Sequence, residues 1–260
     1  MAQCTTFSVG TQMCADAIGI ELKASQLRYL DSETPTLTGL DMHIPAGKWT
    51  SLLGRSGCGK TTLLRYLAGL LDHKVEWQGT LKLSQGHGLQ DNIAYMAQQD
   101  LLLPWLNVID NVMLSRQFGA QNVEHDKAID LLEQVGLAAH INTMPSQLSG
   151  GMRQRVALAR TLMQDKPVVL MDEPFSALDA VTRHKLQTLS AKLLKGKTVV
   201  LITHEPQEAV RLSDALYLLQ GAPAHAHPLD VPASLPPREI DGECAALQRS
   251  ILEQLEQDYE

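Results

Sequence analysis

The stretch from Gly54 to Thr62 constrains the fold of this chain more than any other. Its sequence, GRSGCGKTT, fits the pattern G-x-x-x-x-G-K-[ST], which is typical of a loop that wraps phosphate groups. An apolar run, WTSLL at residues 49–53, predicts a buried strand before it, and LLRYLA at residues 63–68 follows at helical spacing. This order favours a nucleotide-binding α/β fold over a chance match, which composition puts at about one in a hundred.

Each residue type in this loop has a physical use in phosphate binding. Glycines let successive backbone N–H groups turn toward phosphates, and the first helical turn adds unpaired N–H groups and the positive end of its dipole. We expect Lys60 to reach the β- and γ-phosphates and the Thr61 hydroxyl to bind Mg²⁺. The expected nucleotide-binding residues of this loop are Gly54, Ser56, Gly57, Cys58, Gly59, Lys60, Thr61 and Thr62.

Composition narrows the class of protein. A length of 260 residues, 44% of them hydrophobic and 20% charged, is typical of either one large globular domain or one domain with a small appended lobe. The formal net charge of −7 argues against a nucleic-acid partner, and the four scattered cysteines predict reduced thiols in the cytoplasm. We find no secretory signal and no run of about 18 apolar residues, so we expect any membrane connection to come through a partner.

Two further apolar runs end in residues that suit phosphate chemistry. Residues 168–171, VVLM, lead into Asp172 and Glu173, at the carboxyl end of a predicted parallel strand, where ligand sites of open α/β sheets lie. There Asp172 would hold Mg²⁺ and Glu173 would face the attacking water, unless both are simply solvated acids. Residues 198–203, TVVLIT, precede His204, which would either donate to a γ-phosphate oxygen or be a structural histidine.

Three other features each leave two interpretations open. LSGGMRQR at residues 148–155 opens a helix, and its Ser-Gly-Gly turn is either a second anion site or an ordinary N-cap. Tyr29 suits stacking on an adenine ring as well as packing on a strand. LLLPWL at residues 101–106, before a helix that begins near Asn107, is either buried core or an anchor for another protein.

In their order and spacing, these motifs resemble the ATP-binding-cassette (ABC) ATPases over about residues 20–220. The resemblance implies an α/β P-loop NTPase fold with a parallel core sheet, an antiparallel β lobe and a helical signature lobe at about residues 99–160. Residues 1–19 would form an N-terminal extension, and residues 221–260 a Pro-rich linker with a helix at 240–255. Two subunits, expected to be identical, would bind ATP between them head to tail.

The resemblance implies ATP and Mg²⁺ as ligands and assigns roles by position. Tyr29 matches the adenine-stacking aromatic residue, and Lys60 matches the phosphate lysine. Glu173 would be the catalytic base and His204 the switch histidine. The implied Mg²⁺ contacts are Thr61, Gln98 and Asp172.

A second subunit would complete this site. The residues expected to meet the γ-phosphate held by the opposite subunit are Ser149, Gly150 and Gly151. Asp179 would reach toward the opposite phosphate loop. Two departures from the family pattern stand out: Met152 replaces a common glutamine outside the phosphate-facing turn, and Ala97 replaces a common aromatic residue. The second departure leaves both Gln98 and Gln99 as candidates for the loop glutamine.

The run from Leu101 to Val112 is similar to importer ATPases for nitrate, taurine, aliphatic sulfonates and thiamine precursors. That similarity implies an ATPase subunit that drives small-solute uptake from the cytoplasmic face of the inner membrane. Permease subunits would contact this run, and a periplasmic or extracellular solute-binding protein would act indirectly. The alternatives are an export ATPase and a soluble ABC switch without a permease. A third alternative is a metal-responsive regulator that binds its metal through His225 and His227. It is disfavoured, because two histidines are too few ligands for a metal site.

Overall fold

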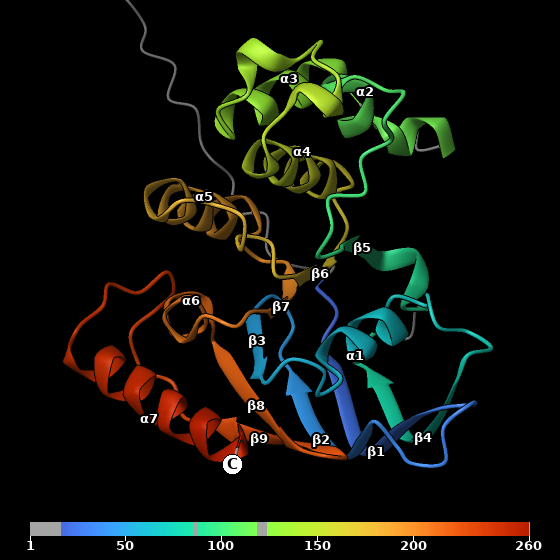
Figure 1. Ribbon diagram of the computed structural model, residues 1–260, viewed down its shortest axis with the longest axis vertical. Helices are drawn as coiled ribbons and strands as arrows, with labels where there is room; N and C mark the ends of the chain where they lie inside the picture. Colours follow the sequence, from blue (N-terminus) through green and yellow to red (C-terminus); the bar gives the residue numbers. More distant parts are fainter. Residues whose placement is uncertain (1–16, 86–87, 119–123, 260) are drawn as a thin grey trace, which may run out of the picture.

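A nine-stranded sheet forms the centre of the molecule, with strand order β4-β1-β2-β9-β8-β3-β7-β6-β5 (Figure 1). The computed structural model describes residues 17–85, 88–118 and 124–259. The strands are β1 (Ile20–Tyr29), β2 (Leu37–Ile44), β3 (Trp49–Gly54), β4 (Val75–Leu83), β5 (Ile93–Met96), β6 (Val168–Asp172), β7 (Thr198–Ile202), β8 (Ala215–Gly221) and β9 (Ala224–Leu229). The α-helices are α1 (Lys60–Leu67), α2 (Val108–Val112), α3 (His125–Gln134), α4 (Gly150–Met163), α5 (Ala180–Leu193), α6 (Pro206–Leu212) and α7 (Gly242–Tyr259).

The sheet has a parallel half and an antiparallel half. Strand β3 pairs in parallel with β7 and β8, and β6 pairs in parallel with β5 and β7. Strands β3, β6 and β7 are buried at every position, as expected for parallel strands that are covered on both faces. Strand β1 pairs antiparallel with β2 and β4. The predicted α/β fold, with a parallel core and an antiparallel lobe, is therefore confirmed.

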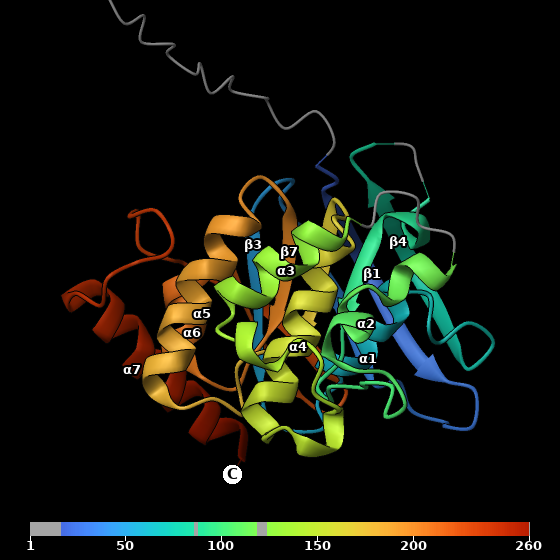
Figure 2. The same ribbon diagram turned by 90° about the horizontal axis from the view of Figure 1, so that it is seen from above.

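Helices α2, α3 and α4 form a lobe that lies apart from the sheet, at the top of Figure 1 and facing the viewer in Figure 2. Helix α4 packs against both α2 and α3, and its apolar side chains between Val156 and Met163 are buried. Side-chain caps begin two of these helices: Asn107 accepts the N–H of Asp110, and Ser149 accepts that of Met152.

Within the described ranges, three apolar cores join the layers. One, represented by Leu158, lies between the helical lobe and the parallel strands. A second, represented by Leu64 of α1, fills the space next to the antiparallel strands. The third, represented by Ile251, joins α7 to α6 and β8, which lie together at the lower left of Figure 1. The C-terminal helix predicted at 240–255 is α7, and the third core fixes it to the sheet.

Strand β9 corrects the expectation of a Pro-rich linker between residue 221 and the helix predicted at 240–255. It lies inside the sheet, antiparallel to β8 and next to β2. Small residues alternate with histidines along it: Ala224 is buried, whereas His225 and His227 are exposed. The two histidines thus occupy the outward positions of a strand. Among the described residues, no group of three or more His, Cys, Asp or Glu side chains could hold a metal ion.

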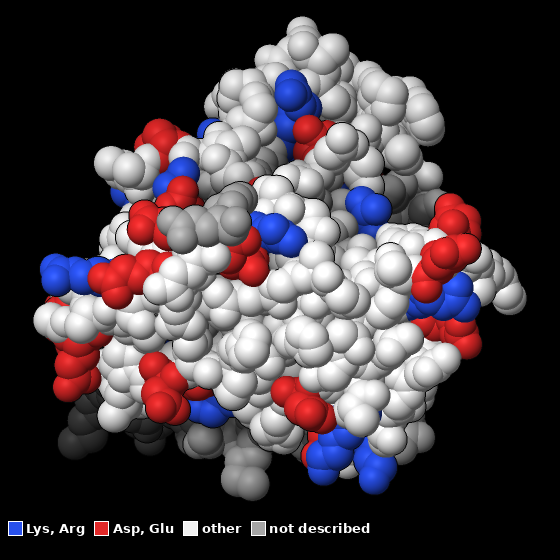
Figure 3. All heavy atoms as spheres, turned by 60° about the horizontal axis from the view of Figure 1, so that its bottom comes forward, with Lys and Arg blue, Asp and Glu red and all other residues white. Residues whose placement is uncertain are grey.

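The start of the described chain is attached to the sheet. Ile18 is buried, and the Gly19 N–H donates to Ser84 Oγ at 2.9 Å; the first sixteen residues of the predicted extension lie outside the described part. No helix within the described ranges has the length and apolar character needed to cross a bilayer. On the underside of the molecule, acidic and basic side chains are scattered among uncharged ones (Figure 3).

Candidate functional site

The phosphate loop connects β3 to α1 through backbone conformations that favour glycine. Gly54 has a φ of 150°, and a Cβ atom there would lie 2.5 Å from the Leu219 carbonyl oxygen, so a larger residue does not fit. Gly59 caps α1 with a φ of 104°. The loop thereby turns sharply at both ends and leaves the first N–H groups of α1 free for an anion.

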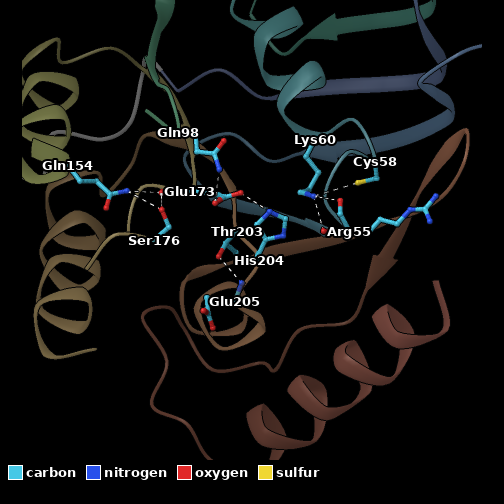
Figure 4. Close-up of polar contacts among 11 residues, drawn as sticks. Arg55, Cys58, Lys60, Gln98, Gln154, Glu173, Ser176, Thr203, His204 and Glu205 are labelled. Carbon is cyan, nitrogen blue, oxygen red and sulfur yellow. Dashed lines mark hydrogen bonds and ion pairs between the residues drawn. The ribbon is translucent and has the colours of Figure 1, made fainter. Parts of the chain in front are cut away.

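Lys60 folds back over this loop. It is only 4% exposed, and its Nζ donates to the carbonyl oxygens of Gly54 and Arg55 at 2.8 Å each (Figure 4). The Cys58 sulfur lies 3.6 Å from the same ammonium group. These carbonyl acceptors are neutral, so they orient the ammonium group without cancelling its charge. The charge remains available to an anionic ligand.

A hollow of about 220 Å³ lies against the loop. Four segments far apart in the sequence contribute to its walls. The lining residues are Ser56, Gly57, Gly59, Lys60, Thr61, Thr62, Gln98, Glu173 and His204. The structure therefore brings the phosphate loop together with Gln98, Glu173 and His204, and Gly54 and Cys58 lie in the loop just behind this wall.

Glu173 links the three non-loop segments. Its Oε1 lies 2.6 Å from His204 Nε2, and its Oε2 accepts from Gln98 Nε2 at 3.1 Å (Figure 4). Glu173 follows β6, His204 follows β7 and Gln98 follows β5. These are three neighbouring parallel strands, and their carboxyl ends meet at one edge of the sheet. Gln98, rather than Gln99, makes the contact. Gln99 lines a neighbouring hollow beside α4, whose wall also includes Gln98.

Asp172 offers a buried carboxylate to a cation. It is 1% exposed, and neither carboxylate oxygen has a hydrogen-bond partner of ordinary geometry within the described part of the chain. Burial raises its pKa, and the charge of Glu173 adds to this; the Thr61 hydroxyl and the cations Arg65 and Lys60 act in the opposite direction. A buried carboxylate beside a threonine hydroxyl fits Mg²⁺, which prefers such oxygen ligands.

The Ser-Gly-Gly turn and Asp179 lie outside this hollow. Ser149 is the N-cap of α4 and is exposed, as is Gly150. Asp179 is the exposed N-cap of α5, where it accepts the Thr182 N–H at 3.0 Å; that hydrogen bond lowers the pKa of Asp179. The turn and Asp179 thus remain accessible to another molecule, as the prediction of a second subunit requires.

Tyr29 lies beside the phosphate loop without lining the hollow. It ends β1, is half-buried, and its hydroxyl is 3.3 Å from Thr62 Oγ1. The hydroxyl contact orients the ring next to the start of α1. Its predicted role in stacking on adenine stays a prediction.

The run from Leu101 to Val112 has two sides. Its helical end is core, with Val108 and Val112 fully buried, whereas Trp105 is 69% exposed and Leu101 is 58% exposed. Asn111, also fully buried, holds the turn that presents the tryptophan: its amide accepts the Leu103 N–H and donates to three carbonyl oxygens of residues 103–107. The helical end of the run is therefore buried core, and the role of its exposed part as an anchor for another protein stays a prediction.

Two buried amides have roles that the sequence motifs do not predict. Gln154 of α4 donates to the Glu173 carbonyl oxygen at 2.9 Å, and Asn111 shapes the Trp105 turn. Their only sequence signal is an amide at an apolar-periodic position of a predicted helix. Such a residue is costly to bury unless its polar atoms find partners, so it marks a specific contact.

Comparison with known proteins agrees with this geometry. The family model described as ABC transporter matches residues 37–176. A protein of Haemophilus influenzae described as an uncharacterized ABC transporter ATP-binding protein is 46% identical over 83% of this chain and 90% of its own length. A protein of Pseudomonas fluorescens described as an aliphatic sulfonates import ATP-binding protein is 40% identical over 90% of this chain and 86% of its own length.

The fold also matches solved structures. A dimeric ATP-binding cassette in a post-hydrolysis state, bound to ADP and Pi, superposes with a TM-score of 0.72 and 28% sequence identity. The match covers 83% of this chain and 100% of that one. The similarity therefore extends over most of this chain and the whole of that cassette.

Proposed function

The chain belongs to the ABC transporter family as an ATP-hydrolysing, ATP-binding cassette, and we propose that it drives solute import through separate membrane permease subunits. The observation that carries the ATPase site is the convergence of Lys60, Gln98, Glu173 and His204 on one hollow. The importer assignment draws on relatives named for sulfonate import and on the exposed Trp105. The subunit would act at the cytoplasmic face of the membrane.

Hydrolysis would proceed by in-line attack of water on the γ-phosphate. Lys60 and the N–H groups of the loop would hold the phosphate oxygens, and Thr61 and Asp172 would hold Mg²⁺, which supplies positive charge to the phosphates when bound. Glu173 would orient the water and take its proton, and His204, whose Nε2 lies 2.6 Å from Glu173 Oε1, would donate toward the γ-phosphate. Catalysis on this view is mainly positioning and charge stabilisation.

A second copy of the chain would complete each site. Its residues 149–151 would cover the γ-phosphate with the N-terminus of α4, and its Asp179 would approach the phosphate loop. ATP would close this dimer and hydrolysis would open it. The exposure of the Ser149 turn and of Asp179 in the single chain supports this arrangement.

Replacing Glu173 by glutamine tests the ATPase site. Glu173→Gln keeps the shape of the side chain but removes its basic oxygen, so hydrolysis should fall by about 10²–10⁴-fold while ATP still binds. Phosphate release and nucleotide binding measure the two effects separately. If Glu173→Gln hydrolysed ATP at the parental rate, another residue would have to orient the attacking water.

Trp105→Ala tests the importer assignment. Aromatic anchors often contribute about 2 kcal/mol or more to an interface, so permease association should weaken about thirtyfold. Because Trp105 is 69% exposed, ATP binding by the isolated subunit should be unchanged. Leu252→Ala, at a 50% exposed apolar residue of α7, is the control. Equal permease binding by Trp105→Ala and the parental chain would favour a cassette that works without a permease at this surface.

A further inference from the structure

Gln154 is a buried amide that joins helix α4 to the loop after β6. Its side chain is 6% exposed and lies in the second turn of α4. Its Oε1 accepts the N–H of Ala177 at 2.9 Å, and its Nε2 donates to the Glu173 carbonyl oxygen at 2.9 Å and to Ser176 Oγ at 3.4 Å (Figure 4). Both ends of the amide are therefore paired, and loss of either contact would leave a buried polar group unsatisfied.

These contacts hold Glu173 in an unusual backbone conformation. Its φ is +50°, in the left-handed region that residues with a side chain rarely adopt, so the neighbouring groups must fix it. Its N–H donates to the Ile202 carbonyl oxygen at 2.9 Å, and its own carbonyl oxygen accepts from Gln154 and, at 3.1 Å, from Ser176 Oγ. The held backbone sets the direction of the Glu173 side chain toward the hollow.

Helix α4 connects the same amide to the Ser-Gly-Gly turn. Residues 149–151 open the helix, and its hydrogen-bonded backbone makes Gln154 move with that turn. The turn also touches the loop directly, because a Cβ atom on Gly151 would lie 3.1 Å from the Ala177 carbonyl oxygen. The turn, the loop after β6 and the Glu173 backbone are thus one connected unit.

We propose that Gln154 is a positioning residue that couples the seating of residues 149–151 to the orientation of the Glu173 carboxylate. When a nucleotide held by a second copy of this chain engages the turn, α4 carries Gln154 with it. The amide then fixes the Glu173 backbone in the geometry that hydrolysis requires. The inference rests on the proposed function, which supplies Glu173 as the base and the turn as the γ-phosphate contact.

Gln154→Glu separates this role from packing. The substitution keeps the size of the side chain and the acceptor for Ala177, but an ionised carboxylate cannot donate to the Glu173 carbonyl oxygen. Acid restores a donor by protonating the introduced carboxyl group. Thr161→Val is the matched control, because Thr161 is 2% exposed on the same helix and its hydroxyl donates to Ala157 within that helix.

In the full-length chain, Gln154→Glu should lower kcat about a hundredfold, the order of loss expected from small misplacement of a reacting group. The KM for ATP should stay within about twofold, because no nucleotide contact is removed. The ratio of its kcat to the parental kcat should rise as the pH falls from about 8 to about 5.5. Thr161→Val should keep the parental kcat.

Combining the substitution with Glu173→Gln tests whether Gln154 acts through Glu173. In Glu173→Gln, adding Gln154→Glu should cause no further loss of the remaining hydrolysis, since coupled sites are not additive. A parental kcat for Gln154→Glu, or a loss that is independent of pH and additive with Glu173→Gln, would overturn the coupling. If Glu173→Gln is inactive and Gln154→Glu keeps the parental kcat, the coupling is wrong but the proposed function is still supported. Parental hydrolysis by Glu173→Gln would instead contradict the proposed base.

Discussion

Glu208 is a buried carboxyl group whose protonation should make the stability of this chain depend on pH. It lies on α6, is 4% exposed and accepts from Gln187 Nε2 at 3.0 Å. Burial raises its pKa from 4.5 to about 7; the Thr203 hydroxyl, the Gln187 amide and the charge of Arg183 lower it only in part. The folded chain therefore keeps this proton to a higher pH than the unfolded chain does.

The magnitude follows from the two pKa values. Between pH 4.5 and about 7 the native state binds more protons at Glu208 than the unfolded state, so the free energy of unfolding falls as the pH rises. At about 1.4 kcal/mol per unit, the loss reaches about 3 kcal/mol above pH 7. Glu208→Gln is neutral at every pH and can still accept from Gln187, so it should be more stable than the parental chain at pH 8 by up to that amount.

Denaturant unfolding of both proteins at pH 5 and pH 8 measures this difference. The advantage of Glu208→Gln should be present at pH 8 and much smaller at pH 5, and its melting temperature at pH 8 should be higher by about 6–12 °C. Glu253→Gln is the control, because that carboxylate is exposed on α7 and should leave the pH dependence unchanged. Equal pH slopes for Glu208→Gln and the parental chain would refute the argument.

Three further predictions concern the nucleotide site. Asp172→Asn should raise the unfolding free energy of the nucleotide-free chain near neutral pH, because burial raises the pKa of this carboxyl group, and it should abolish the extra thermal stabilisation by Mg²⁺ with ATP. Lys60→Ala should abolish binding of a fluorescent ATP analogue, and near-normal hydrolysis would contradict its role. A bulky thiol reagent at Cys58, 5% exposed beside Lys60, should block ATP binding, and bound ATP should slow the labelling; a labelled, fully active chain would show that the loop tolerates the adduct.

The sequence could predict the phosphate hollow because its chemistry dictates contiguous residue types. Glycine at position 54 is required where a Cβ atom would collide with the Leu219 carbonyl oxygen. Buried strands end one residue before Glu173 and two residues before His204. Parallel strands bring those ends to one edge of the sheet. Each motif could therefore be placed near the others before their distances were known.

Contacts that depend on tertiary geometry were not predictable in this way. Gln154 and Asn111 act on backbone groups that lie elsewhere in the chain or around a turn, so periodicity shows only where they sit on a helix. Strand β9 was missed because prolines and histidines favour a loop assignment, although Ala224, His225 and Ala226 begin the period of two that a half-buried strand requires. Pairing with β8 outweighed the local preference.

The loop after β6 lies between the two exposed helix caps, Ser149 and Asp179, and contacts the helix that Ser149 begins. Ser149 begins α4 and Asp179 begins α5, and each presents a helix N-terminus at the surface. Ala177 connects them, because its N–H donates to Gln154 of α4 and its carbonyl oxygen lies against Gly151. Ala177 stands four residues after Glu173 and two before Asp179, so a partner bound at either cap would act close to the backbone of Glu173. On this argument, a larger side chain at Gly151 would disturb hydrolysis even where it leaves the phosphate contact open.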